Sequence, residues 1–138
     1  MMSTALKITV QSLIDQLWNG GNLATIDQFY APTIVRRQPP FPAVAGLATY
    51  RDFLVTTFAT FADLHMTADE MVVEGNTVVL HGTWRAKQIG PLAWANLPAT
   101  GKAFAVPYCT VLHFQEGKVV EELVNVDHLG MLQQLRGD

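Results

Sequence analysis

GKVVEELVNVDHLG, residues 117–130, is the stretch that decides the fold. Acidic and apolar side chains alternate over residues 119–126, which predicts a half-buried strand. Asp127 follows where a short helix begins. An Asp at this position is typical of a helix N-cap, because its carboxylate accepts the free N–H groups of the first turn. The end of a strand can equally present a carboxylate inside a cavity, where it exchanges protons with a ligand. Both interpretations of Asp127 remain open at this point.

The turn before this strand determines which residues face one another. A two-residue loop would force a positive φ on Glu116, whereas a three-residue loop that ends in Gly117 requires it only of that glycine. We therefore predict the three-residue loop, which pairs His113 with Val119 and places it on the same face as Asp127. The distance between His113 and Asp127 along the strand is then roughly 26 Å, at ~3.3 Å per residue. A direct dyad of these two residues is not expected.

Upstream of this stretch the apolar period is helical first and alternating later. Three helices and then four strands are predicted, at residues 3–18, 23–30 and 47–61 for the helices and 63–74, 77–88, 101–114 and 119–126 for the strands. Such a segregated order is typical of an α+β fold in which N-terminal helices pack on a curled antiparallel sheet. In the second strand the apolar face carries Trp84 and Gln88, and we expect the helices to cover this face.

Two proline-bounded segments interrupt this order. Residues 39–42, PPFP, can neither continue a helix nor donate in a sheet, so they form an ordered loop or a lid. Residues 90–98 combine apolar side chains without any period. They predict a loop over the mouth of a cavity, a place where binding residues concentrate.

The composition is that of one domain, residues 1–138, with more apolar surface than an ordinary core needs. Hydrophobic residues make up 49% of the chain and charged residues 15%, so the surplus should line a cavity, a subunit interface or both. The formal net charge of −3 predicts no nucleic-acid partner. The single cysteine, Cys109, suits a reducing cytosol. We see neither a signal-peptide pattern nor a run of about 18 apolar residues, so we expect a cytoplasmic protein that does not bind membranes.

No metal or organic cofactor is expected from the motifs. The histidines and acids show no pair at a metal-ligand spacing such as His-Glu-x-x-His. No glycine-rich phosphate loop, Gly-x-Ser-x-Gly elbow or Cys-His pairing is present either.

Three short motifs together resemble one protein family. LPATGK at residues 97–102 is similar to a Pro-Pro-Thr-Gly-Lys turn, GKVVE at residues 117–121 to Gly-Lys-Ile-x-Glu, and DHLG at residues 127–130 to Asp-x-x-Gly ahead of a Leu-rich last helix, here residues 131–135. In this order and spacing they resemble the SnoaL-like polyketide cyclases, which belong to the nuclear-transport-factor-two-like superfamily. The likeness covers nearly the full chain.

The resemblance implies a fold, an assembly and a reaction. The fold is a cone-shaped α+β barrel around a deep apolar pocket, and the assembly is commonly a homodimer through the outer face of the sheet. In the cyclases an Asp matching Asp127 acts as acid and base in an intramolecular aldol closure of a polycyclic ester, without metal or organic cofactor. Holding both reacting groups in one bound molecule supplies much of such an acceleration.

The chain departs from this family at three places. Arg37-Gln38-Pro39 stands where many relatives carry His-x-Pro, Gln88 stands for the His of a Gly-Thr-His segment, and Leu123 stands for a Trp before the final Asp. These changes remove two imidazoles and an indole from the expected pocket. The reaction therefore does not follow from the fold alone.

The candidate site has Asp127 as its catalytic residue. Trp84 is expected to stack on an aromatic ligand, and Gln88 is expected to donate a hydrogen bond from the same face. Arg37 is expected to form an ion pair with an anionic ligand or with Asp127 itself. The predicted substrate-binding residues are Trp84, Gln88, Asn125, Arg37 and Tyr30. Plainer roles stay open, with Trp84 as core and Arg37 as a solvated surface residue. In the predicted register Tyr108 and His128 lie away from the pocket.

Two functions remain open. One is a cofactor-independent cyclase- or isomerase-type enzyme that acts on a hydrophobic small molecule. The other is a non-catalytic module of the same fold that binds a small molecule or serves for dimerisation.

Overall fold

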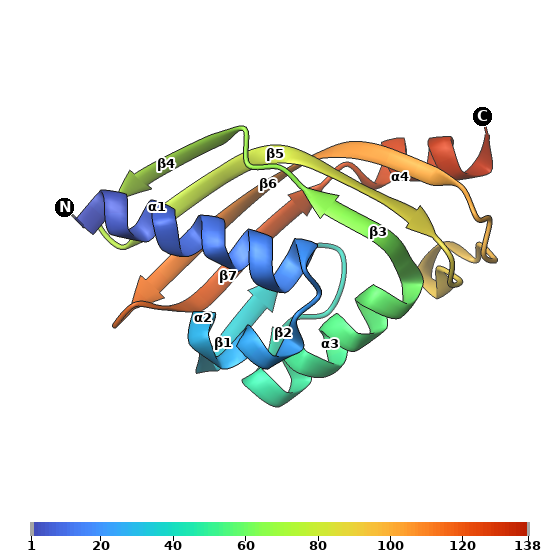
Figure 1. Cartoon of the computed structure of the whole chain (residues 1–138). Coiled ribbons are helices and arrows are strands. Elements are labelled where there is room, and N and C mark those ends of the chain that lie inside the picture. The colour runs from blue at the N-terminus through green and yellow to red at the C-terminus, as the bar shows by residue number, and fades with distance from the viewer. Residues whose placement is uncertain (1, 138) are drawn as a thin grey trace.

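The computed structural model describes residues 2–137. Helices dominate the first part of the chain and strands the second, as predicted, but two strands, Tyr30–Arg37 and Val44–Ala45, precede the helix Leu47–Thr60, and a last helix follows the strands. In chain order the elements are α1 Met2–Leu13, η1 Ile14–Asn19, η2 Leu23–Thr25, α2 Ile26–Phe29, β1 Tyr30–Arg37, β2 Val44–Ala45, α3 Leu47–Thr60, β3 Phe61–Met66, β4 Glu70–Glu74, β5 Thr77–Gln88, η3 Ala93–Ala95, β6 Ala103–Gln115, β7 Lys118–Val126 and α4 His128–Arg136. η1 is a π-helical continuation of α1, and η2 and η3 are short 3₁₀ turns. The α+β class is confirmed (Figure 1).

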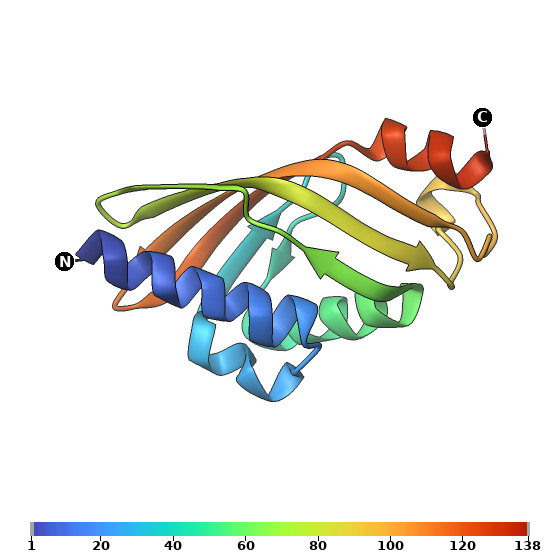
Figure 2. The ribbon, with the colours of Figure 1, turned by 45° about the horizontal axis from the view of Figure 1, so that its top comes forward.

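The sheet is curled, mixed and open. Its strand order in the described residues is β2-β1-β7-β6-β5-β3, and β4 also pairs with β5. All pairings are antiparallel except that of β1 with β7, which is parallel. The sequence had suggested a purely antiparallel sheet, and the parallel pairing of β1 with β7 differs from that prediction. Figures 1 and 2 show α1, α2 and α3 on one side of the sheet and α4 near the far ends of β6 and β7.

The strand predicted at residues 63–74 is divided into β3 and β4, which both pair with β5. The link between them runs along the same edge of β5 and packs closely on Gly82, where an added Cβ would lie 1.7 Å from the backbone oxygen of Thr67. Only a glycine permits so close an approach of two backbones. The hydroxyl of Tyr108 donates to the same Thr67 oxygen at 2.9 Å. This close contact therefore fixes the edge of the sheet.

The apolar stripe of the first helix packs against the inner face of the sheet. Its buried members are Leu6, Val10, Leu13, Ile14, Leu17 and Trp18, and they belong to the main hydrophobic core. Each large side chain buried in this way contributes about 1.5–3 kcal/mol to folding. Ile8, 63% exposed, lies off this stripe.

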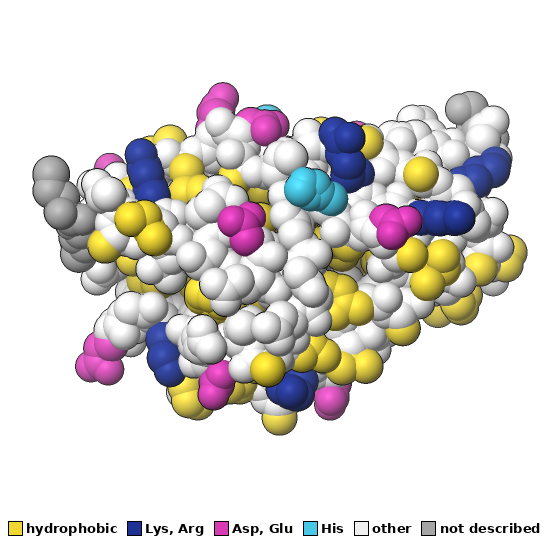
Figure 3. All heavy atoms as spheres, in the orientation of Figure 1, with side chains coloured by type: hydrophobic (Ala, Val, Ile, Leu, Met, Phe, Trp, Pro, Cys, Tyr) yellow, Lys and Arg dark blue, Asp and Glu magenta, His cyan; other side chains and the backbone are white. Residues whose placement is uncertain are grey.

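On the face drawn in Figure 3, Lys and Arg side chains are interspersed with Asp and Glu among hydrophobic ones.

The β6–β7 hairpin has a different turn from the predicted one. Glu116 and Gly117 form a two-residue turn with φ of 51° and 78°, so Glu116 does adopt the positive φ that the longer loop would have avoided. A register shift follows, and His113 pairs with Glu121 rather than with Val119. This register shift is a β-bulge between His113 and Phe114, and it compensates for the shorter turn. Away from the turn, the odd-numbered residues of β6 and β7 therefore still share one face of the sheet, as predicted.

The prediction was wrong about which of these two faces points inwards. The buried residues of β6 are Phe104, Val106, Tyr108, Thr110, Leu112 and Phe114. Glu122 is paired with Leu112, and Val124 with Thr110. Because paired residues share a face, Glu122 points inwards and Asn125 outwards.

Candidate functional site

A cavity of about 490 Å³ lies between the curled sheet and the helices that cover it. Most of its wall is apolar. The polar residues that line it are Arg36, Gln38, Thr56, Thr57, Thr60, Tyr108, Thr110, Glu122 and His128. Small-molecule sites commonly have volumes of roughly 300–1,000 Å³, an apolar wall and a few convergent polar groups. This cavity has each of these properties.

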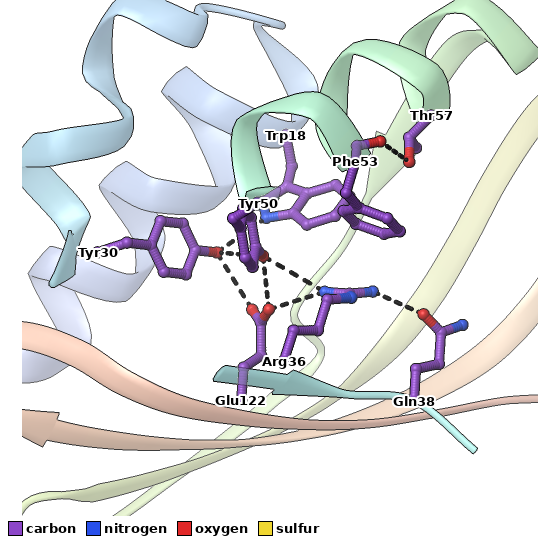
Figure 4. A network of polar contacts seen from close by, with 8 residues as sticks. All are labelled: Trp18, Tyr30, Arg36, Gln38, Tyr50, Phe53, Thr57 and Glu122. Atoms are coloured by element: carbon purple, nitrogen blue, oxygen red, sulfur yellow. Dashed lines mark hydrogen bonds and ion pairs between the residues drawn. The ribbon is translucent and has the colours of Figure 1, made fainter. Parts of the chain in front are cut away.

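Glu122 on β7 is the acid that lines the cavity, among the residues described, and it is only 3% exposed. The Tyr30 hydroxyl donates to its Oε1 at 3.1 Å, and the Tyr50 hydroxyl donates to its Oε2 at 2.5 Å. Nη1 of Arg36 donates to the same Oε2 at 2.8 Å. Figure 4 shows these side chains converging from β1, α3 and β7. A carboxylate accepts such a set of donors, because both of its oxygens are acceptors only.

The two tyrosines of this network are held in their protonated form. Burial raises the pKa of Tyr30 and of Tyr50, and the negative charge of Glu122 raises each pKa further. Nε1 of Trp18 donates to the Tyr30 oxygen at 3.3 Å. Both phenols therefore act as donors to Glu122 and fix its orientation.

Arg36 on β1 brings a positive charge to the cavity wall. Its guanidinium lies 5.2 Å from the ring centroid of Trp18 and 4.8 Å from that of Phe53, a cation–π arrangement on both rings. Burial, the largest single effect, lowers the pKa of Arg36, but the charge and hydrogen bond of Glu122 together with Tyr50 and Tyr30 outweigh burial, so the net pKa is raised. Nε of Arg36 is buried and has no hydrogen-bond partner among the described residues. An oxygen of a bound ligand or a water would satisfy this donor.

Gln38 connects Arg36 to His128 at the exposed rim of the cavity. Nη2 of Arg36 donates to Oε1 of Gln38 at 2.9 Å, and Nε2 of Gln38 lies 3.2 Å from Nε2 of His128. The His128 ring packs edge-on against Phe41 and Trp94, with centroids 5.2 and 5.5 Å away. Burial lowers the pKa of His128, and the charge of Asp127 opposes this effect only in part. The imidazole is therefore neutral at pH 7.

Asp127 lies outside the cavity, so the prediction that it faces inwards is wrong. The residue is exposed, and its Oδ1 accepts the Gly130 N–H at 2.8 Å as the N-cap of α4. A Cβ at Gly130 would lie 2.3 Å from Oδ2 of Asp127. The Asp-x-x-Gly motif therefore combines the capping carboxylate with the room it needs. The cap interpretation of Asp127 is confirmed.

Trp84 lies on the cavity wall, where its ring packs against Phe61 and Phe104 with centroids 5.1 and 4.9 Å away. Tyr30 is fully buried and does not line the cavity, although its hydroxyl contacts Glu122, which does. Of the predicted substrate-binding residues, Trp84 is thus placed for direct contact and Tyr30 for indirect support.

Gln88 points inwards as predicted but does not line the cavity. Its amide donates to the Gly90 oxygen at 2.9 Å and to the Pro98 oxygen at 3.2 Å, and it accepts the Thr100 N–H at 3.1 Å. These bonds satisfy the buried amide and secure the 90–100 loop. The predicted contact of Gln88 with a ligand therefore has no place in this geometry.

Arg37 and Asn125 point away from the cavity, and their predicted positions in it are wrong. The Arg37 side chain is 54% exposed and pairs with Glu121 at 3.4 Å. Asn125 is exposed on the outer face, opposite Cys109. The inward position of β1 is Arg36, one residue earlier than predicted, because successive residues of a strand face opposite sides.

Sequence reasoning missed Glu122, Arg36 and Gln38, and it placed Tyr108 and His128 away from the pocket, although both line it. A usable signal was present in β6, where the large apolar residues Phe104, Val106, Leu112 and Phe114 all occupy even positions. Tyr108 is even-numbered too, so this pattern places it on the inner face.

The Tyr108 side chain is also buried. Burial, and then the charge of Asp69, raises the pKa of Tyr108 to about 12.

Within residues 2–137, no group of three or more His, Cys, Asp or Glu side chains is arranged to hold a metal ion. The helices of that same part of the chain are all too short or too polar to span a membrane.

Known proteins share this architecture over most of the chain. The family profile described as SnoaL-like polyketide cyclase matches residues 8–135. A solved structure from Jannaschia sp. CCS1, described as a candidate SnoaL-like polyketide cyclase, is 24% identical with a TM-score of 0.87, covering 98% of this chain and 94% of its own. TsrD from Streptomyces laurentii is 30% identical with a TM-score of 0.79, covering 93% and 95%.

A more distant likeness concerns the fold alone. A protein from Catenulispora acidiphila DSM 44928, described as having a ketosteroid isomerase-like fold and solved with trimethylamine, is 16% identical with a TM-score of 0.79, covering 93% of this chain and 92% of its own. No curated protein matches the chain.

Proposed function

Because the chain belongs to the SnoaL-like polyketide cyclase family, we propose that it is a cofactor-independent enzyme of the cyclase or isomerase type. Its substrate is a largely apolar small molecule that carries a carbonyl group, and His128, not Asp127, exchanges the proton. One observation carries this proposal. A connected series of polar side chains runs along the wall of this mostly apolar cavity, from Glu122 through Arg36 and Gln38 to His128.

His128 is the base that the cavity offers. Its imidazole lines the wall, is neutral at pH 7 and belongs to the residue type that most often moves protons in enzymes. Asp127 lacks such a position, since its carboxylate is exposed and occupied by the α4 cap. Glu122 is held by three donors and is better suited to fix the charge of Arg36 than to collect a proton.

The proposed step is an intramolecular carbon–carbon bond formation. His128 removes the proton from a carbon next to one carbonyl, and the released electron pair forms a bond to the carbon of a second carbonyl in the same molecule. The imidazolium then returns the proton to the resulting alkoxide, so the product is an isomer of the substrate. Arg36 stabilises the negative oxygen that develops during this step. The apolar wall, including Trp84, holds the molecule in the folded shape that ring closure requires.

The proton-transfer step can be tested with a polycyclic aromatic β-keto ester in D₂O. We expect the protein to accelerate deuterium incorporation at the acidic carbon, measured by mass spectrometry, even where the ring does not close. His128→Gln should reduce this rate by about 10²–10⁴-fold, the usual contribution of a general base. Asp127→Asn is the matched control, because Asn also caps helices. Equal rates for His128→Gln and the unaltered protein would refute the role of His128.

The second candidate is a binding protein that holds the same kind of molecule without turnover. It is favoured by the position of Asp127, because the acid that the family resemblance identifies as catalytic lies outside the cavity. Quenching of the fluorescence of Trp18, Trp84 and Trp94, which all line the cavity, would report binding of the ester. Saturable quenching without any deuterium incorporation would support this alternative over the enzyme.

We also propose that two copies of the chain associate through the outer face of the sheet. Val79, Val111 and Leu123 lie side by side there across β5, β6 and β7, and all three are partly exposed. Burying such an apolar row stabilises an interface. Leu123→Glu should turn a dimer into a monomer in light-scattering measurements, and an unchanged mass would refute this interface.

A further inference from the structure

Gln38 lies between the fixed charge of the cavity and its titratable imidazole. It follows β1 directly, lines the cavity and is partly buried. Its Oε1 is 2.9 Å from Nη2 of Arg36, and its Nε2 is 3.2 Å from Nε2 of His128. The two ends of one amide therefore touch two groups whose hydrogen-bonding needs differ.

Arg36 determines which way the Gln38 amide points. A guanidinium has only donors, so the amide oxygen must face it and the amide NH₂ must face His128. The reverse orientation would bring N–H groups of Arg36 and Gln38 together. Arg36 cannot turn away from this arrangement easily, because Glu122 holds its Nη1 and its guanidinium packs against the rings of Trp18 and Phe53.

The amide in turn determines where His128 carries its proton. The NH₂ group of Gln38 can only donate, so Nε2 of His128 must accept. A neutral imidazole with an accepting Nε2 has its hydrogen on Nδ1. We propose that Gln38 is a positioning residue that, oriented by Arg36, holds His128 as the neutral Nδ1–H tautomer, so that Nε2 is its one basic nitrogen.

This inference rests on the proposed function only for its consequence in catalysis. When Nε2 takes up a proton, the hydrogen bond from Gln38 is lost and two donors face each other. Gln38 thereby opposes a permanent positive charge on His128, and the imidazole remains in its basic form before substrate binds. The proton is then held only for the lifetime of the intermediate.

The charged groups around His128 do not set its tautomer. Asp127, the cap of the same helix, attracts the imidazolium. Arg36 lies beyond Gln38 on the β1 side, with its charge balanced by Glu122. The loop after β1 and η3 contribute the rings of Phe41 and Trp94. Gln38 is thus the group that bonds directly to Nε2.

Long-range ¹H–¹⁵N correlation spectra of the His128 ring test this proposal without any substrate. In the unaltered protein at pH 7.5 we expect a protonated-type Nδ1 signal and an unprotonated-type Nε2 signal. The reverse pattern, with the hydrogen on Nε2, would overturn the proposal. This measurement needs no variant, so it does not depend on whether an altered protein folds.

Two substitutions of Gln38 sharpen the test. Gln38→Met removes the donor and should give a mixture of the two tautomers. Gln38→Glu replaces the donor by an acceptor and should raise the pKa of His128 by about 1–2 units, the usual effect of an opposite charge in contact. Gln133→Glu is the matched control, because it adds the same charge on the exposed side of α4 without contacting His128.

The outcomes separate this inference from the proposed function. A pKa of His128 that rises equally in Gln38→Glu and Gln133→Glu would refute the positioning role. A confirmed tautomer together with full deuterium exchange in His128→Gln would leave the positioning intact and refute catalysis by His128. If His128 is the base, Gln38→Glu should also shift the acidic limb of the pH–rate profile upwards by the same 1–2 units, whereas a purely structural role would lower the rate equally at every pH.

Discussion

Glu122 and Asp127 lie on the same short segment of chain and have opposite surroundings. Glu122 is 3% exposed and accepts hydrogen bonds from Tyr30, Tyr50 and Arg36. Asp127 is exposed and accepts one hydrogen bond, from the Gly130 N–H. The carboxylate that belongs to a recognisable motif stabilises a helix, and the one without a motif lines the cavity. Strand alternation, not motif membership, decides what an acid at this place can do.

Glu121 and Glu122 repeat the contrast between two adjacent residues. The pair Arg36–Glu122 has an N–O distance of 2.8 Å, with side chains 8% and 4% exposed. The pair Arg37–Glu121 has a distance of 3.4 Å, with side chains 54% and 37% exposed. The parallel pairing of β1 with β7 creates both ion pairs, one on each face of the sheet. Only the inner pair is removed from water.

The largest effect is expected from breaking the inner ion pair. Glu122→Ala leaves the charge of Arg36 buried without its partner and takes the acceptor from two phenols, which should lower the free energy of unfolding by about 3–5 kcal/mol. Glu121→Ala is the matched control and should cost about 0–1 kcal/mol, because exposed pairs contribute little. Urea unfolding followed by circular dichroism measures both. Similar losses for the two variants would show that Glu122 is not buried as described.

Removing both charges tests whether the inner pair acts as a unit. Arg36→Met combined with Glu122→Leu leaves no buried charge uncompensated, so the double variant should be more stable than the sum of the two single changes by about 2–3 kcal/mol. The same unfolding measurement completes the cycle. Additive losses would mean that Arg36 and Glu122 contribute independently.

Much of the fold could be predicted from sequence because it follows from local periodicity. The helical stripe of α1 and η1 and the span of β5 were both correct. The division of β3 from β4 was not predictable in this way, because it depends on a close backbone contact between Thr67 and Gly82. The parallel pairing of β1 with β7 joins segments far apart in the chain, and no local pattern reveals it.

The site was harder to predict because it depends on which face of each strand points inwards. Arg36 and Arg37 are the same residue type, and they differ only in that Arg36 faces the inner side of the sheet and Arg37 the outer side. Glu122 was overlooked since a buried acid contradicts the usual rule that acids face water. The network of donors that makes its burial possible comes from β1 and α3, and pairwise spacing in the sequence does not show it. Trp84, placed by its apolar neighbours alone, was located correctly.

Substitutions at the outer carboxylate should have smaller effects than those at the inner one. Asp127→Ala removes the cap of α4 and should lower the free energy of unfolding by about 1 kcal/mol, while Asp127→Asn should change it by only a few tenths. Neither change should alter deuterium incorporation into the keto ester by more than about twofold, because Asp127 lies outside the cavity. A tenfold loss in Asp127→Asn with an unchanged fold would restore Asp127 as the catalytic acid.

The smallest effect concerns pH, where the two regions meet at His128. Burial lowers the pKa of His128 from its ordinary value of 6.5, so between the two pKa values the unfolded chain binds more protons than the folded one. Stability should therefore fall as the pH drops below about 6.5, and it should regain its full value above that pH. In His128→Asn this part of the acid sensitivity should disappear, as measured by Tm between pH 5 and 7.5, since the remaining histidines are common to both proteins. In Asp127→Asn the sensitivity should increase, because the variant lacks the carboxylate that opposes the effect of burial in the unaltered protein. A reduced sensitivity in that variant would contradict this assignment of opposing effects to burial and to the cap.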